Sequence, residues 1–90
     1  MTERETLDRV KRMLVTRFEL DFQPKDLADD EPIFAGRLGL DSMAAMDLIA
    51  GVEEAFTLVI DDEDLLLTNF ETPVAISSFV NSKRPASSGS

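Results

Sequence analysis

Near the start of the chain, apolar residues recur at helical spacing, at Leu7, Val10, Leu14 and Phe18. Side chains three and four positions apart share one face of an α-helix, so this stripe predicts a helix that buries one side. Thr2 and Glu5 match the capping box Thr-x-x-Glu, in which each side chain satisfies a backbone N–H at a helix start. We therefore expect the first helix to begin at Thr2.

Helical periodicity stops over residues 21 to 40, where Pro24, the acidic residues 29–31 before Pro32, Gly36 and Gly39 interrupt it. A loop this long is uncommon in a small domain unless it packs or has a function. Its apolar residues are spaced so that they can pin it onto a helical core, and these are Leu27, Ile33, Phe34, Leu38 and Leu40.

A second helix is predicted from about Ser42 to about Phe56. At about 100° per residue, five apolar side chains fall within one arc of roughly 100°, which is typical of a buried face. These are Ala45, Leu48, Ile49, Val52 and Phe56.

The same helix carries a surplus apolar stripe, Met43, Met46 and Ala50, on nearly the opposite side. Asp47, Glu53 and Glu54 flank this stripe. One interpretation is that the long loop covers it. The other is a docking surface, because methionine adapts to partners of different shape and surrounding carboxylates orient them.

After Ile60, the pattern predicts a short helix over Asp62–Leu67, with acids in the first turn where the helix dipole favours them. Its run of four acids at residues 61–64 invites a calcium interpretation. The ligand alternation and turn glycine of an EF-hand loop are both missing, so we expect no metal site.

The last helix should begin at Thr72, a good N-cap, followed by Pro73 at the first helical position. Lys83 and Arg84 suit its C-terminal end, and Pro85 stops it. Its apolar face is expected to consist of Val74, Ile76, Phe79 and Val80. The predicted fold is all-α: a small bundle of three main helices plus one short helix, with a long first loop. One domain should span residues 1–82, with a disordered tail over residues 83–90.

The amino-acid composition excludes several kinds of site and catalysis. The 90 residues suffice for one small domain, and the chain has neither cysteine nor histidine. A disulfide framework, a thiolate zinc site and histidine general-base catalysis are therefore excluded within this chain. The charged N-terminal segment is unlike a secretion signal, and no apolar stretch approaches about 18 residues. We expect a cytoplasmic monomer that does not associate with membranes.

The net charge of −9 is unevenly distributed. Residues 38 to 82 contain nine acids and no Lys or Arg, whereas the other residues carry nine acids and nine bases. This field favours basic partner surfaces and opposes nucleic acid. We expect the basic residues of the first helix to form its solvated side: Arg4, Arg9, Lys11, Arg12 and Arg17.

Ser42 stands where the long loop gives way to the second helix. The first turn of a helix has unpaired N–H groups and the positive end of the dipole, so a phosphate ester is favoured there. The alternative is that Asp41 or Ser42 is a plain N-cap. That alternative lacks a capping box, because Ala44 and Ala45 stand where Glu or Gln would be needed.

The surrounding segment, Gly39-Leu40-Asp41-Ser42-Met43 and its continuation to Phe56, resembles the acyl carrier protein family, including its peptidyl and aminoacyl carriers. The resemblance extends from about Leu7 to Val80, since residues 60–65 and 69–72 also match the family's later loop and helix starts. Two positions depart from the commonest pattern: Met43 replaces the usual Leu of fatty-acid carriers, and Thr57 stands where Gly is frequent.

The resemblance implies that Ser42, next to Asp41, carries 4′-phosphopantetheine derived from coenzyme A. It implies a carrier, not an enzyme, which holds acyl intermediates as thioesters and shuttles them between enzymes of fatty acid or polyketide-type biosynthesis. Expected partners are a phosphopantetheinyl transferase and acyl-loading and acyl-processing enzymes with basic docking surfaces. The expected partner-binding residues are Met43, Met46, Asp47, Ala50, Glu53 and Glu54.

Two alternatives remain open. The chain could be an aminoacyl or peptidyl carrier loaded by an adenylating enzyme. It could instead be an unmodified acidic helical module whose methionine-bearing helix binds a basic partner. An enzyme is disfavoured because the acids are accompanied by no evident pocket or general base.

Overall fold

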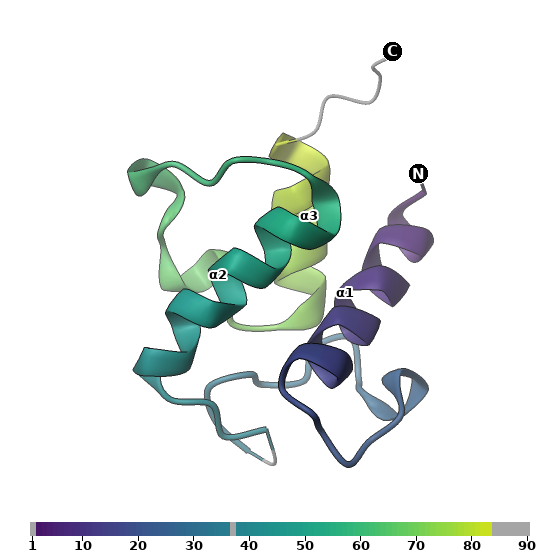
Figure 1. Ribbon diagram of the computed structural model, residues 1–90. Coiled ribbons are helices and arrows are strands. Elements are labelled where there is room, and N and C mark those ends of the chain that lie inside the picture. The colour runs from purple at the N-terminus through teal and green to yellow at the C-terminus, as the bar shows by residue number, and fades with distance from the viewer. Residues whose placement is uncertain (1, 37, 84–90) are drawn as a thin grey trace.

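Three α-helices are arranged so that α1 packs against both others (Figure 1). The computed structural model describes residues 2–36 and 38–83. The helices are α1 (Glu3–Arg17), α2 (Ser42–Phe56) and α3 (Pro73–Lys83), and the short 3₁₀ turns are η1 (Pro24–Asp26), η2 (Asp62–Asp64) and η3 (Leu67–Asn69). No strand occurs in the described part of the chain, so the all-α prediction is confirmed.

Local sequence signals set the helix starts as predicted. At α1, Glu5 N–H donates to Thr2 Oγ1 at 3.1 Å, and Thr2 N–H donates to Glu5 Oε1 at 2.8 Å, which completes the capping box. At α3, Ala75 N–H donates to the Thr72 hydroxyl at 3.1 Å, with Pro73 as the first helical residue.

The core is shared by the three helices and by the long loop. Residues 18–41, which we call the first connector, bury Leu27, Ile33 and Leu38 against the helices. Residues 57–72, the second connector, contribute Phe70, whose ring lies 5.3 Å from that of Phe79. The central helical residues of the core are Val10, Leu14, Leu48, Val52, Phe56, Ile76 and Val80.

Backbone hydrogen bonds attach the first connector to the start of α3. Ile33 N–H donates to Glu71 O at 2.9 Å, and Val74 N–H donates to Asp29 O at 2.9 Å. The packing expected of the long loop is therefore confirmed, and it satisfies backbone groups that burial would otherwise leave unpaired.

Two basic residues expected on the solvated side of α1 are engaged elsewhere. Lys11 is buried, and its Nζ lies 2.7 Å from Asp29 Oδ1. Arg17 lies against α2 and pairs with two of its acids. The prediction was wrong for these two because the connector and α2 bring carboxylates to them. Arg4, Arg9 and Arg12 are exposed, as predicted.

Three further expectations need correction. The short helix predicted over 62–67 is replaced by η2 and η3, because the chain leaves helical geometry at Leu65 (ψ 59°). Val74, assigned to the apolar face of α3, is exposed because it lies on a different side of the helix from the buried residues Pro73, Ile76, Ser77 and Val80. The tail expected over residues 83–90 begins one residue too early, because Lys83 is the last residue of α3, which confirms its expected place at the C-terminal end of that helix. Residues 84–90, with Arg84 and Pro85, lie outside the described residues.

Within the described residues, no helix is both long and apolar enough to cross a membrane. That part of the chain also holds no cluster of three or more acidic side chains arranged to bind a metal ion.

Candidate functional site

The segment before α2 is positioned by a chain of backbone hydrogen bonds. Leu40 N–H donates to Ile33 O at 3.0 Å, and Ile33 in turn is bonded to Glu71 at the start of α3. Gly39 has φ +53°, a left-handed conformation in which a residue with a Cβ is strained. The turn that leads into residues 41 and 42 is therefore anchored to the start of α3.

Asp41 is the N-cap of α2. Its backbone is extended (φ −94°, ψ 179°), and its Oδ1 accepts the Ala44 N–H at 3.0 Å. The capping interpretation is confirmed for Asp41 without a capping box. Because Asp41 takes the capping role, Ser42 becomes the first helical residue, and it is exposed.

The surroundings of Ser42 fit a phosphate ester. The first turn of α2 contains no acidic side chain, and its backbone N–H groups and dipole present positive potential. The exposed hydroxyl needs no rearrangement of the core to reach solvent. The donor set is therefore that of an anion site at a helix start.

The two methionines that follow are exposed: Met43 to 84% and Met46 to 69%. The first connector does not cover them, so the interpretation of the stripe as covered core was wrong. Ala50 is half-buried at its far end. On the opposite side Leu48, Val52 and Phe56 are buried, with Ala45 and Ile49 partly so, as the periodicity predicted.

Residues 8–80 match the family model described as "Phosphopantetheine attachment site". The chain belongs to this family. It is a phosphopantetheine-binding carrier, and 4′-phosphopantetheine is the prosthetic group of such domains. Carriers of this family interact with a phosphopantetheinyl transferase and with the biosynthetic enzymes that they serve. The match covers α2, both connectors and most of α1 and α3, and it includes Ser42.

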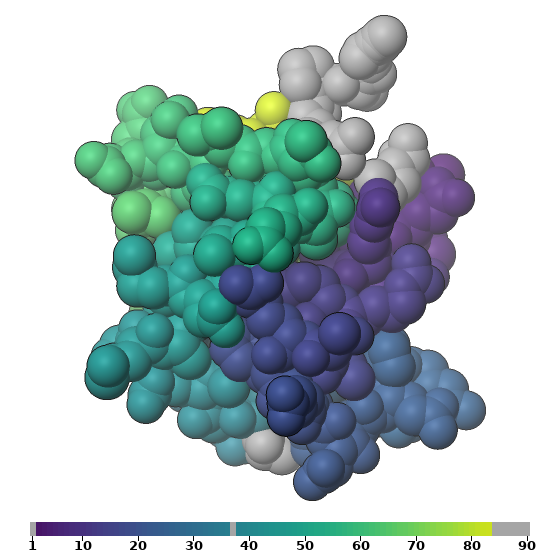
Figure 2. Space-filling view, in the orientation of Figure 1, coloured from purple at the N-terminus to yellow at the C-terminus, as the bar shows by residue number. Residues whose placement is uncertain are grey.

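An apolar cavity of about 180 Å³ adjoins the buried edge of α2 in this carrier. Figure 2 shows the second connector in green and the start of α2 in teal on the same side of the molecule. Sequence reasoning missed the cavity, and its only signal was the uninterrupted run of three leucines. The lining residues are Phe34, Ala45, Ile49, Leu65, Leu66, Leu67 and Phe70.

The acids beside the exposed methionines all have partners within the carrier. Asp47 and Glu54 bind Arg17, at 2.8 and 3.2 Å from its Nη2 and Nη1. Glu53 Oε2 accepts the Ile60 N–H at 2.9 Å. The ion pairs with Asp47 and Glu54 raise the pKa of Arg17, chiefly through the hydrogen bond to Asp47. That these acids and the methionines bind partners stays a prediction.

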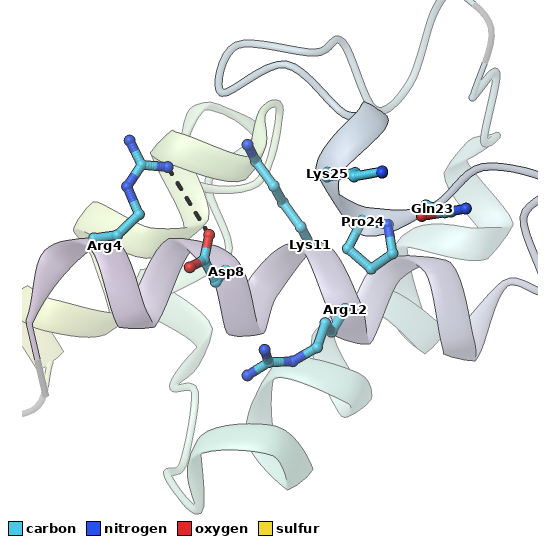
Figure 3. Close-up of a pocket in the computed structure, with 7 residues that line it drawn as sticks. All are labelled: Arg4, Asp8, Lys11, Arg12, Gln23, Pro24 and Lys25. Carbon is cyan, nitrogen blue, oxygen red and sulfur yellow. Dashed lines mark ion pairs between the residues drawn. The ribbon is translucent and has the colours of Figure 1, made fainter.

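A second hollow, of about 490 Å³, lies between α1 and η1, and none of its lining residues comes from α2 (Figure 3). Figure 3 shows that Lys11 and Arg12 leave α1 on opposite sides, and Lys11 is already bonded to Asp29. The basic side chains therefore do not converge on one point, and we assign no ligand to this hollow.

Proposed function

We propose that Ser42 is the attachment residue and that the protein carries acyl groups between enzymes of a fatty acid or polyketide-type pathway. The observation that carries the proposal is the division of roles at the start of α2. Asp41 holds the turn by capping Ala44, and this leaves the hydroxyl of Ser42 exposed at the positive end of the helix.

The attached group would supply the one function that this chain lacks, a nucleophilic thiol that can hold an acyl group as a thioester. Ser42 would provide the phosphodiester oxygen, and the first-turn N–H groups would stabilise the phosphate. Asp41 would fix the position of Ser42 through its hydrogen bond with the Ala44 N–H.

The apolar cavity favours an acyl cargo over an aminoacyl one. All seven of its lining side chains are apolar. An aliphatic chain gains by leaving water there, whereas an ammonium group would lose hydration without finding a partner. An aminoacyl or peptidyl carrier is the second candidate, and loading by an adenylating enzyme in place of an acyl-loading enzyme would favour it.

The attachment site is tested by incubating the protein with coenzyme A and a broad-specificity phosphopantetheinyl transferase, followed by mass spectrometry. Ser42→Ala should fold normally and take up no phosphopantetheine. Ser78→Ala is the matched control, since Ser78 is another exposed serine on a helix, and it should be modified like the parent. Modification of Ser42→Ala would overturn the assignment, and an unmodified parent that still binds basic partners would favour an adaptor.

The docking role of the methionines is tested by comparing Met46→Ala with Leu48→Ala. Met46 is mostly exposed and Leu48 is fully buried. Met46→Ala should cost less than about 1 kcal/mol of unfolding free energy, against about 2 to 5 kcal/mol for Leu48→Ala. Met46→Ala should nevertheless slow modification of Ser42. An unchanged rate would remove Met46 from the docking surface.

A further inference from the structure

Arg17, the last residue of α1, reaches across to the acidic face of α2. Its Nε and Nη2 donate to Asp47 Oδ1 at 3.1 and 2.8 Å, and its Nη1 donates to Glu54 Oε1 at 3.2 Å. The arginine side chain is 26% exposed, whereas those of Asp47 and Glu54 are 51% and 72% exposed. The guanidinium thus lies between α1 and α2 and is less exposed than the two carboxylates, which flank the methionine stripe.

Gly51 makes room for this arrangement. Asp47, Gly51 and Glu54 are spaced four and three residues apart, so they share one helical face. A Cβ at Gly51 would lie 2.6 Å from Arg17 Cδ and 3.0 Å from Met13 Sδ. Glycine inside a helix is destabilising relative to alanine, and here its missing side chain leaves a slot for the arginine stem.

Arg17 lowers the negative charge of the α2 surface where partners are expected to bind. Without Arg17, Asp47 and Glu54 would present two negative charges, and with it the cluster carries one. Glu53 is engaged by Ile60 N–H and Asp41 by Ala44 N–H. A cation on a partner therefore meets two carboxylates whose charge the Arg17 guanidinium already partly neutralises.

We propose that Arg17 is a partner-selectivity residue, which weakens attraction of strongly basic enzymes to α2 and favours partners that contact Met43 and Met46 mainly through apolar surface. This inference rests on the proposed function, since it assumes that enzymes reach Ser42 over this face. Specificity of this kind comes from lowering the affinity of the wrong partner as well as raising that of the right one.

The test measures kcat/KM for modification of Ser42 by a broad-specificity phosphopantetheinyl transferase, in parent, Arg17→Gln and Arg12→Gln. Arg12 is exposed on the same helix, so both variants remove one positive charge, but only Arg17→Gln removes the ion pairs with Asp47 and Glu54. Arg17→Gln should raise kcat/KM about two- to fivefold at low salt, and the gain should shrink between about 50 and 200 mM salt. Arg12→Gln should give a smaller gain.

Two more variants test whether the change in kcat/KM arises from the contacts between Arg17 and the α2 carboxylates. Arg17→Lys keeps the charge but loses the fork that holds two carboxylates, so its kcat/KM should fall between parent and Arg17→Gln. Adding Asp47→Asn to Arg17→Gln should return kcat/KM toward the parent value. Circular dichroism on each variant verifies that the helices are retained, and Arg17→Lys decides the matter if Arg17→Gln does not fold.

Equal rates in parent, Arg17→Lys and Arg17→Gln would overturn the inference alone, and so would equal gains in Arg17→Gln and Arg12→Gln. A parent that takes up no phosphopantetheine would overturn the proposed function and this inference together. The two failures are therefore distinguishable by whether Ser42 of the parent is modified.

Discussion

The two connectors both link α2 to a neighbouring helix, but the first buries its apolar residues whereas the second leaves many of them exposed. The first connector buries Leu27, Ile33 and Leu38 and is bonded through its backbone to the start of α3. The second leaves Leu65, Leu66 and Leu67 43%, 58% and 63% exposed beside the apolar cavity. The first connector is part of the core, whereas the three leucines of the second line one side of the cavity and are largely exposed to solvent.

This difference matches the positions of the connectors around the site. The first connector delivers Asp41 and Ser42, whose orientation needs a rigid support. The second borders the cavity, where few buried contacts allow local opening at low free-energy cost. These positions support the proposal above, in which Ser42 is held in place by the first connector while the cavity beside the second connector takes up and releases the cargo.

The largest expected difference between the connectors is the cost of truncating a core residue. Ile33→Ala should lower the unfolding free energy by about 2 to 5 kcal/mol, because Ile33 is fully buried among the three helices. Leu66→Ala, the matched truncation in the second connector, should stay within about 0.5 kcal/mol. Urea denaturation measures both, and similar losses would show that the second connector is also core.

A medium effect is expected at the left-handed residue that each connector carries next to α2. Gly39 (φ +53°) precedes the helix, and Thr57 (φ +52°) is its C-cap. Gly39→Ala should cost about 1 to 2 kcal/mol through backbone strain alone, since the nearest atom to the new Cβ would be Gly36 O at 3.5 Å.

Thr57→Gly should have the opposite sign and stabilise the fold by about 0.5 to 1 kcal/mol, because a β-branched residue is strained there. Thermal unfolding of both variants checks the pair. If Thr57→Gly proves destabilising, contacts of the threonine side chain outweigh the backbone strain.

The smallest effects concern the Asp–Lys ion pairs that tie each connector to a helix. Lys11 lowers the pKa of Asp29, and Lys83 lowers the pKa of Asp64, in each case mainly through a hydrogen bond. A depressed carboxyl pKa stabilises the fold above the ordinary aspartate value of 3.8, and this stability is lost as the pH falls through the lower folded value.

Unfolding midpoints measured at decreasing pH should therefore decline less in Asp29→Asn and Asp64→Asn than in the parent. At neutral pH, Asp29→Asn should be the more destabilising of the two, since it leaves the buried Lys11 without its partner whereas Lys83 keeps Asp61. A larger loss of stability in Asp64→Asn than in Asp29→Asn would mean that the second connector depends more on its ion pairs than the first does.

The features that were predicted correctly depend on residues close together in the sequence. Thr2 and Glu5 are three residues apart, as are Thr72 and Ala75, so helix starts follow from local hydrogen bonds. The burial of Leu48 follows from helical spacing, whereas only the structure decided that the long loop leaves Met46 exposed. Ser42 at the start of α2 was recognisable because its signature occupies consecutive residues.

What the sequence missed depends on residues far apart in the chain. Arg17 and Asp47 are thirty positions apart, and no periodicity links an arginine on one helix to a carboxylate on another. The apolar cavity likewise forms only where the three leucines come beside α2 and Phe70 in the fold.

The sequence by itself therefore determined the helices, the buried stripes and the candidate attachment serine, because hydrogen bonds and side-chain direction repeat over three or four residues. Only the tertiary structure decided which charges are paired, which connector is core and where the cavity opens. Those outcomes depend on distances between separate elements, and such distances exist only once the chain has folded.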